Sequence, residues 1–307
     1  MNKRLLLISI VVCTGYHNIF SQDLLSGLEE EAPKKEFVKN AFKSTRVINA
    51  HSLEFVGAGV LDFRILHRFG LINSGAYDAF GFDVARMRLG LDYGISKRLM
   101  FGIGRATYKK ESDAFLKYRL LWQAKGKGAS PFSIVLVSGI TCSGLKFEKP
   151  EQKNYFSSRL AYYHQVIIGR KFSERFSFQV APTLVHNNLV DKITDKNDIY
   201  NITSGIRIKL TRRVALTADY IYQLTNQLPD EITQPLSIGF DIETGGHVFQ
   251  LHFTNAVGMN ERVLAMETNG NWDEGDIHFG FNISRVFTIV KRKPGAAKTD
   301  VWKEYPK

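Results

Sequence analysis

The sequence predicts an all-β protein, a closed antiparallel transmembrane β-barrel of about 12 strands. Three observations carry this prediction. Apolar and polar residues alternate from His51 almost to Val290, so each strand has a dry face and a wet face. The alternating stretches are about 10 to 13 residues long, which suits a tilted membrane crossing. Short turns and longer polar loops join them in alternation, as in barrels with short periplasmic turns and longer external loops.

The chain begins with a stretch typical of a secretory signal peptide, expected over residues 1–22. Lys3 and Arg4 form a charged start, an apolar run follows over residues 5–12, and small or polar residues precede Asp23. We therefore expect cleavage close to residue 22 and export from the cytoplasm.

The two cysteines offer little chemistry. A lipoprotein signal that uses Cys13 is the alternative to simple cleavage, but Val12 and Thr14 stand beside it where small residues are usual. If Cys13 leaves with the signal peptide, Cys142 is the single cysteine of the mature chain, and a lone thiol makes neither a disulfide nor a CxxC site.

The two ends of the mature chain differ from the body in composition. Residues 23–50 contain an acidic run, Pro33 and then several lysines, which predicts a short periplasmic N-terminal extension. Residues 51–290 are assigned to the barrel. Residues 291–307 form a basic C-terminal tail, in which Lys291 to Lys293 and Pro294 end the last strand. An even number of strands places this tail in the periplasm as well.

The strands follow in chain order. The alternation is plainest over residues 53–65, 85–95, 116–122, 160–168, 176–184, 202–210, 214–222, 236–242, 249–253 and 277–289. Short turns are expected at residues 94–98, 170–175, 211–213 and 244–246, and longer loops near residues 69–80, 142–157, 189–197, 227–234 and 258–275. A soluble β-sandwich is the alternative, but aromatic residues gather where strands meet the short turns, as at a membrane interface: Tyr93, Phe101, Trp122, Phe132, Phe176, Phe249 and Phe287.

Charged residues on the wet faces are expected to line the lumen. The candidates are Arg64, Arg86, Arg88, Lys117, Arg119, Arg207, Asp219 and Asp241. Gly102, Gly104 and Ala106 on the intervening strand leave room for long arginine side chains. A basic wall of this kind favours anions. The alternative is that Glu54, Asp62 and neighbouring acids neutralise the wall and fill a narrow barrel.

Enzymatic and cofactor sites are poorly supported by the sequence. Ser138 and His164 fall on apolar faces of neighbouring strands, but we do not expect them to lie directly opposite one another, and no third group stands ready to orient the imidazole. The histidines show no metal-binding spacing, so no catalytic residue, metal or cofactor is expected. The net charge of +11 is spread along the chain, which speaks against a nucleic-acid partner.

One family resemblance adds to this interpretation. The stretches "DLLSGLEEE", "GVLDFRILHRFG" and "MRLGLDYGISKRLMFGIGRATYKKESDAFLKYRLLWQ" resemble an uncharacterised family of bacterial outer-membrane β-barrels typical of Bacteroidetes. The likeness is strongest over residues 23–123. It implies the barrel and its compartment. The family has a domain-of-unknown-function label and no established site residues, so the resemblance implies no activity.

These observations together predict a protein of the Gram-negative outer membrane. Its expected role is to pass or bind a small solute, with a modest preference for anions. A non-conducting structural or anchoring component is the alternative, and a lipid-facing hydrolase comes third. The expected partners are membrane lipid, lipopolysaccharide and a small solute, and the sequence identifies no periplasmic partner.

Overall fold

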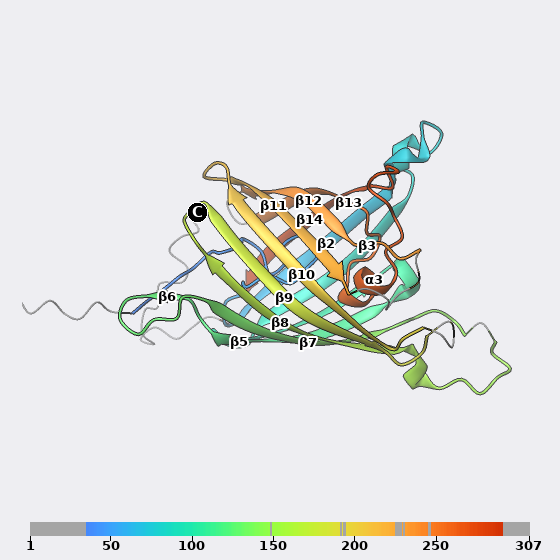
Figure 1. Cartoon of the computed structure of the whole chain (residues 1–307), viewed down its shortest axis with the longest axis horizontal. Helices are drawn as coiled ribbons and strands as arrows, with labels where there is room; N and C mark the ends of the chain where they lie inside the picture. Colours follow the sequence, from blue (N-terminus) through green and yellow to red (C-terminus); the bar gives the residue numbers. More distant parts are fainter. Residues whose placement is uncertain are drawn as a thin grey trace, which may run out of the picture.

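A closed antiparallel barrel of twelve strands forms the body of the molecule (Figure 1). This computed structural model describes residues 35–147, 149–190, 192, 195–224, 229, 231–244 and 247–290. The expected signal peptide and basic tail lie outside the described residues. No helix in the described part of the chain is long and apolar enough to cross a membrane. The predicted fold class is confirmed.

The barrel strands pair in chain order, and the last closes on the first. They are β2 (Val60–Leu71), β3 (Ala85–Gly94), β4 (Leu99–Ala106), β5 (Ser112–Leu121), β7 (Ser133–Cys142), β8 (Leu160–Lys171), β9 (Phe176–Asn187), β10 (Asp198–Lys209), β11 (Val214–Gln223), β12 (Leu236–Thr244), β13 (His247–Thr254) and β14 (His278–Thr288). A separate two-stranded ribbon pairs β1 (Glu36–Phe37) with β6 (Ala124–Lys125). Because every barrel strand has two neighbours, the barrel leaves no open edge in the bilayer.

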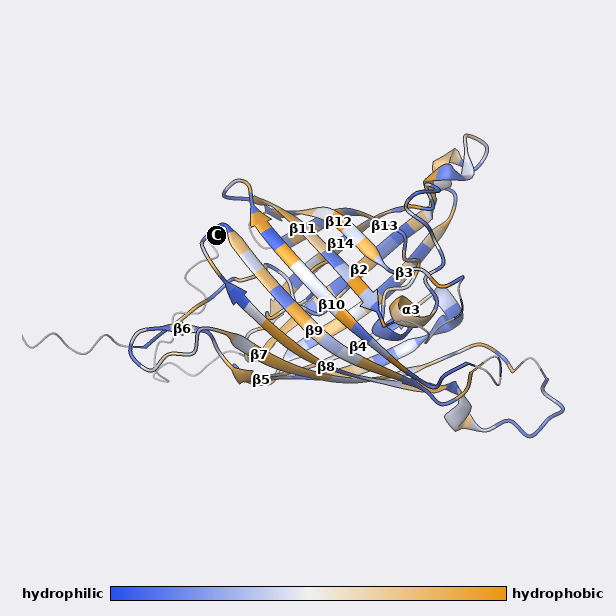
Figure 2. Cartoon of the chain, in the orientation of Figure 1, coloured by the Kyte–Doolittle hydropathy of each residue, from blue (hydrophilic) through white to orange (hydrophobic). Residues whose placement is uncertain are grey.

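The outward faces of the strands are apolar. On β3, Leu89 and Leu91 are exposed, whereas Arg88 and Asp92 on either side of them are buried in the interior. Apolar and polar residues alternate in the same way along most of the barrel (Figure 2). The exposed apolar side chains are therefore the surface that contacts lipid.

The connections divide the barrel into two ends. Short turns join β3 to β4, β8 to β9 and β10 to β11, and β2 begins and β14 ends on the same side, which makes this the periplasmic end. The other end carries longer loops with the short helices η1 (Ile72–Ser74), η2 (Ala79–Gly81), η3 (Tyr108–Lys110), η4 (Phe156–Arg159) and α3 (Glu261–Met266). This is the external end.

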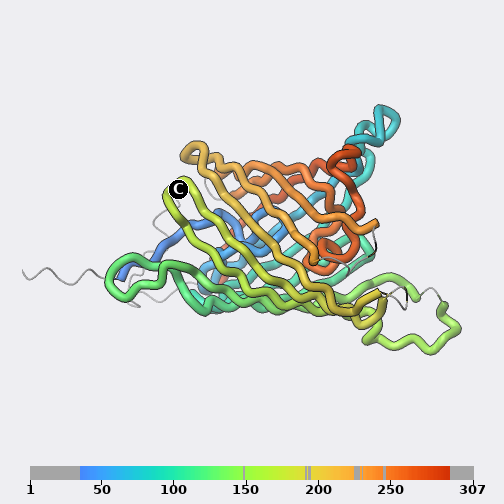
Figure 3. Tube along the Cα trace, in the orientation of Figure 1, coloured from blue at the N-terminus to red at the C-terminus, as the bar shows by residue number. Residues whose placement is uncertain are grey.

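Residues 41–56, which we call the plug, fold into the lumen before the first barrel strand. Phe42, Val47 and Ile48 are buried there, and the trace passes inside the ring of strands (Figure 3). This differs from the expectation that residues 23–50 form a periplasmic extension, since residues 41–50 lie inside the barrel. The physical reason is that the lumen offers both apolar surface and hydrogen-bond partners to this segment.

Candidate functional site: a lumen filled from both ends

One part of the lumen wall is apolar, and we call it the apolar sector. It consists of inward-facing side chains on β4, β5, β7, β8 and β9: Met100, Phe115, Val135, Val137, Tyr163, Ile167, Ala181 and Val185. The plug places Phe42, Val47, Leu53 and Val56 in the same buried cluster. Burial of each such side chain contributes roughly 1.5–3 kcal/mol. The plug is therefore held on this side by ordinary core packing.

The remaining wall, formed by inward residues of β10 to β14, β2 and β3, is mostly polar, and we call it the polar sector. Here the plug is bound through its backbone. The Asp219 carboxylate accepts hydrogen bonds from the amides of Ile48, Asn49 and Ala50 at 3.1, 2.7 and 3.0 Å. Three successive amides that converge on one carboxylate oxygen fix the tip of the plug, because hydrogen bonds to a charged acceptor are the stronger kind.

Further wall side chains bind plug carbonyl groups. Asn282 of β14 donates to the Ile48 carbonyl at 3.0 Å, and Gln250 of β13 donates to that of Val47. Three donors on other strands reach the returning limb of the plug: Lys117 to Glu54 O at 2.7 Å, Arg119 to Leu53 O at 3.1 Å and Gln179 to His51 O at 2.6 Å. The wall thus provides the hydrogen-bond partners that water would otherwise provide to the plug backbone.

Arg88 and Asp113 form a buried ion pair across β3, β4 and β5. The Arg88 Nε donates to Asp113 Oδ1 at 2.8 Å, and its Nη2 contacts the second carboxylate oxygen. The guanidinium lies over Gly104, where an added Cβ would fall 2.2 Å from Nη2. The prediction that small residues here make room for a long arginine is confirmed.

The sequence-predicted lining residues lie in different surroundings. Seven of them have buried side chains in the interior: Arg64, Arg88, Lys117, Arg119, Arg207, Asp219 and Asp241. Arg86 is only half-buried, and its guanidinium lies 5.3 Å from the ring centre of Tyr108 near the external end. Two of the basic residues have carboxylate partners, since Arg64 lies 3.5 Å from Asp62 and Arg88 pairs with Asp113. The wall therefore carries charge of both signs.

The external end of the lumen is occupied by α3, which the sequence did not predict. The Asn260 side chain caps it by accepting from the Val263 amide at 3.0 Å. Arg262 Nε donates to Glu111 Oε1 at 2.6 Å, and Glu111 also accepts from Asn260 Nδ2 at 2.9 Å. The helix is thereby tied to the loop between β4 and β5.

A second set of charges surrounds the end of α3. Glu267 lies 2.8 Å from Lys109 Nζ and 2.5 Å from Arg262 Nη1, and it accepts from the Tyr108 hydroxyl at 3.1 Å. Burial alone would raise the pKa of the Glu267 carboxyl, but the two cations hold it below its ordinary value. Burial and the Glu267 carboxylate raise the pKa of Tyr108 to about 12.

The plug and α3 meet inside the barrel. Arg46 Nη1 lies 2.7 Å from Glu261 Oε1, and the same nitrogen donates to the Asn49 carbonyl at 2.6 Å. His51 Nε2 is 3.3 Å from the same Glu261 oxygen and 3.3 Å from the Tyr163 hydroxyl. The sequence shows no sign of this contact, because Arg46 and Glu261 stand 215 positions apart.

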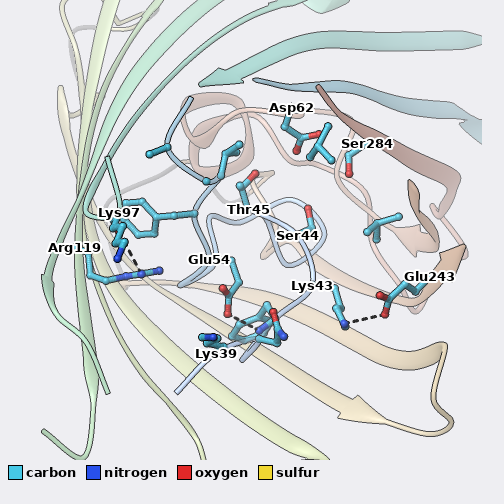
Figure 4. Close-up of a pocket in the computed structure, with 18 of the residues that line it drawn as sticks. Lys39, Lys43, Ser44, Thr45, Glu54, Asp62, Lys97, Arg119, Glu243 and Ser284 are labelled. Atoms are coloured by element: carbon cyan, nitrogen blue, oxygen red, sulfur yellow. Dashed lines mark hydrogen bonds and ion pairs between the residues drawn. The ribbon is translucent and has the colours of Figure 1, made fainter. Parts of the chain in front are cut away.

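A cavity of about 190 Å³ lies at the periplasmic mouth, between the plug and the strand ends (Figure 4). Arg119 lies between the rings of Phe55 and Trp122, at 4.3 and 4.0 Å from their centres. Lys43 and Glu243 form an ion pair of 2.8 Å at another side. The plug itself contributes to the lining of this cavity, with Phe42, Ser44 and Thr45.

Ser138 and His164 correct one sequence expectation. They are direct partners in the register of β7 and β8, and Ser138 Oγ lies 2.9 Å from His164 Nδ1 on the exposed outer face. We expected them not to be opposite one another, and that expectation was wrong. Among the described residues no acid or amide bonds to the other ring nitrogen, so the pair has no orienting third group.

Comparison with known proteins identifies the family. A family described as a membrane bound beta barrel domain, of unknown function, matches residues 42–287. The chain belongs to this family. The family resemblance seen in the sequence is confirmed, and the bacterial group stays a prediction. This membrane bound barrel is a protein of the Gram-negative outer membrane.

Solved structures similar to this membrane bound barrel include two porins and an enzyme. The NanC porin has a TM-score of 0.46 and 8% identity, covering 74% of this chain and 98% of the porin. The KdgM porin in complex with disordered oligogalacturonate has a TM-score of 0.45 and 9% identity, covering 74% and 99%. Outer membrane phospholipase A from Escherichia coli has a TM-score of 0.42 and 10% identity, covering 73% and 92%. No curated protein matches the chain in sequence. Similarities this distant identify neither a cargo nor a reaction.

Proposed function

We propose that this protein is a gated passage for small polar solutes through the outer membrane, closed at rest by its own plug. The observation that carries the proposal is that residues 41–56 fill the lumen and meet α3 from the external end. The cavity at the periplasmic mouth is lined on one side by the plug residues Phe42, Ser44 and Thr45. Solutes therefore pass only when the plug has left.

The polar sector supports a passage rather than a solid core. Side chains such as Asp219, Asn282 and Gln250 bind the plug through its backbone, so water and polar solutes can replace it there. Lys117 and Arg119 donate to backbone carbonyls in the closed state. Withdrawal of the plug leaves both cations, which lie on β5, without these partners. The buried charged side chains of the described barrel strands then comprise six cations and five carboxylates: Arg64, Arg68, Arg88, Lys117, Arg119 and Arg207 against Asp62, Asp92, Asp113, Asp219 and Asp241. A modest preference for anions follows from this imbalance.

The apolar sector favours a second candidate, a non-conducting structural or anchoring barrel. Phe42, Val47, Leu53 and Val56 leave apolar surroundings when the plug moves, and the wall residues they cover become exposed to water. At roughly 1.5–3 kcal/mol for each side chain, opening needs an external source of free energy. The two candidates differ in whether an open state with current exists.

Planar-bilayer conductance separates these candidates. Asp219→Asn weakens the three amide contacts of the plug tip, whereas Asp198→Asn changes an exposed carboxylate at the external end of neighbouring β10 and serves as the matched control. We expect no steady current from the wild-type protein or the control, and bursts of current from Asp219→Asn. Deletion of residues 41–56 is a second opening variant.

The outcomes that contradict the proposal are distinct. Steady current through the wild-type protein would show that the plug does not close the lumen. If neither opening variant carries current although circular dichroism shows an intact β-barrel, the non-conducting candidate is favoured. In an opening variant, Lys117→Gln with Arg119→Gln is expected to lower anion selectivity, and an unchanged reversal potential would remove the proposed anion preference.

A further inference from the structure

The plug enters from the periplasmic end and α3 enters from the external end, and a buried ion pair joins them. We infer that α3 and the plug form a single latch, through which displacement of the external β13–β14 loop releases the periplasmic plug. The inference concerns the seating of the plug and holds whether or not the open barrel conducts. It makes the barrel a device that transmits an external binding event across the membrane.

The first step is the Arg46–Glu261 contact. The two side chains are 1% and 6% exposed and lie 2.7 Å apart. The removal of one partner leaves the other charged and buried without its counter-ion, which is strongly unfavourable. The plug is therefore most stable in its seat when Glu261 is in place.

The second step links Glu261 to the external surface. Its neighbour in α3, Arg262, is held by Glu111 and Glu267, and Glu267 pairs with Lys109. The Lys109 side chain is 36% exposed. A run of ion pairs thus leads from an exposed lysine to the helical turn that carries Glu261. Because Glu261 and Arg262 are adjacent in one short helix, a displacement of Arg262 also moves Glu261.

The third step is that the other attachments of α3 are side-chain contacts inside the lumen. Ala265 belongs to the apolar cluster that contains the plug residue Phe42, and Met266 packs against this cluster. The Gln223 side chain donates to the Ala265 carbonyl at 2.6 Å, and Leu264 packs with Ile221 and Ala256. The helix spans only residues Glu261–Met266. Such a short element depends on its side-chain contacts to hold its place, so a ligand that competes for them can displace it.

The test measures plug accessibility by thiol labelling. Cys13 and Cys142 are replaced by Ser, and the plug residue Ala50, which is buried, is replaced by Cys. The rate of reaction with a polyethylene glycol maleimide then reports how often the plug leaves its seat. We expect Glu261→Gln to raise this rate about tenfold or more. Glu243→Gln, which breaks the more exposed ion pair with Lys43, is the matched control and is expected to change it by less than about threefold.

A reciprocal measurement distinguishes a latch from simple loosening. Thermodynamic linkage requires that the plug stabilise the position of α3 by the same free energy by which α3 stabilises the position of the plug. A buried thiol at Ala265→Cys is therefore expected to label faster in Arg46→Gln, by a factor similar to that seen in the plug. The double variant Arg46→Gln with Glu261→Gln is expected to label no faster than either single variant, since it leaves no unpaired charge.

Two results would overturn the latch. One is an unchanged labelling rate at residue 50 in Glu261→Gln, with the barrel still folded by circular dichroism. The other is a labelling rate in the double variant that is raised by the product of the two single-variant factors. Such a product would mean that the two side chains act independently, because the free-energy effects of independent sites add. Neither result depends on current through the barrel, so the latch and the proposed passage fail separately.

Discussion

The apolar and polar sectors hold the same plug by different means. The apolar sector packs against plug side chains such as Phe42 and Leu53, whereas the polar sector binds plug amides and carbonyls through Asp219 and Asn282. The stability gained from apolar packing depends on the buried area and tolerates small shifts in the position of the plug. Hydrogen bonds depend on direction. The apolar sector therefore supplies most of the stability of the plug, and the polar sector fixes its position.

The largest expected effect tests the apolar sector. Phe115 is 3% exposed inside the barrel, and Phe115→Ala is expected to lower the free energy of unfolding by about 3–5 kcal/mol, because it removes a large buried side chain and leaves a cavity. Leu116→Ala on the lipid side of the same strand, at a residue 47% exposed, is the control. Equilibrium urea unfolding in lipid vesicles measures both. Equal losses in the two variants would contradict an interior core on this side.

A smaller effect is expected in the polar sector. Asn282 donates to the Ile48 carbonyl and to Gln250, and it accepts from Arg68 at 3.1 Å. Asn282→Ala is expected to cost about 1–3 kcal/mol in the same unfolding measurement, because buried polar groups lose their partners. It is also expected to raise the labelling rate at residue 50. Ser284→Ala, two positions along the same face of β14, is the control. A plug that stays equally protected in both variants would show that the polar sector does not position it.

The barrel itself could be predicted from the sequence, because alternation is a local property. Leu89 and Leu91 against Arg88 and Asp92 indicate both faces of β3 without knowledge of any other strand. The rule is less informative on β7, where Val135 and Val137 face inward and Leu136 faces outward, so both faces are apolar. An apolar inward face indicates that other apolar residues fill the lumen there. This feature of β7 is the one from which the plug could have been predicted.

The contents of the lumen could not be predicted, because they depend on contacts between distant parts of the chain. Residues 41–50 mix five apolar residues with charged and small polar ones, and this mixture does not by itself distinguish a buried segment from a solvated one. Inside the barrel, Arg46 has a counter-ion in Glu261 and Ser44 accepts from Arg64 at 2.7 Å. Likewise, Ser138 and His164 meet only because of the register of β7 with β8, which the sequence pattern leaves open. Pairings of this kind follow from the closed topology and not from local patterns.

The smallest expected effect concerns the charges around α3, which differ from both sectors in their response to pH. The pKa of Glu267 is held below its ordinary value of 4.5 by Arg262 and Lys109, against the opposing effect of burial. A depressed carboxyl pKa stabilises the fold fully above pH 4.5, and this contribution is lost as the pH falls through the lower folded value. The difference in unfolding free energy between the wild-type protein and Glu267→Gln is therefore expected to be constant above pH 5 and to shrink on acidification below about pH 4.5. For Phe115→Ala, which removes no titrating group, the corresponding difference is expected to stay level over the same range. Parallel profiles for the two variants would show that charge around Glu267 does not hold α3 in place.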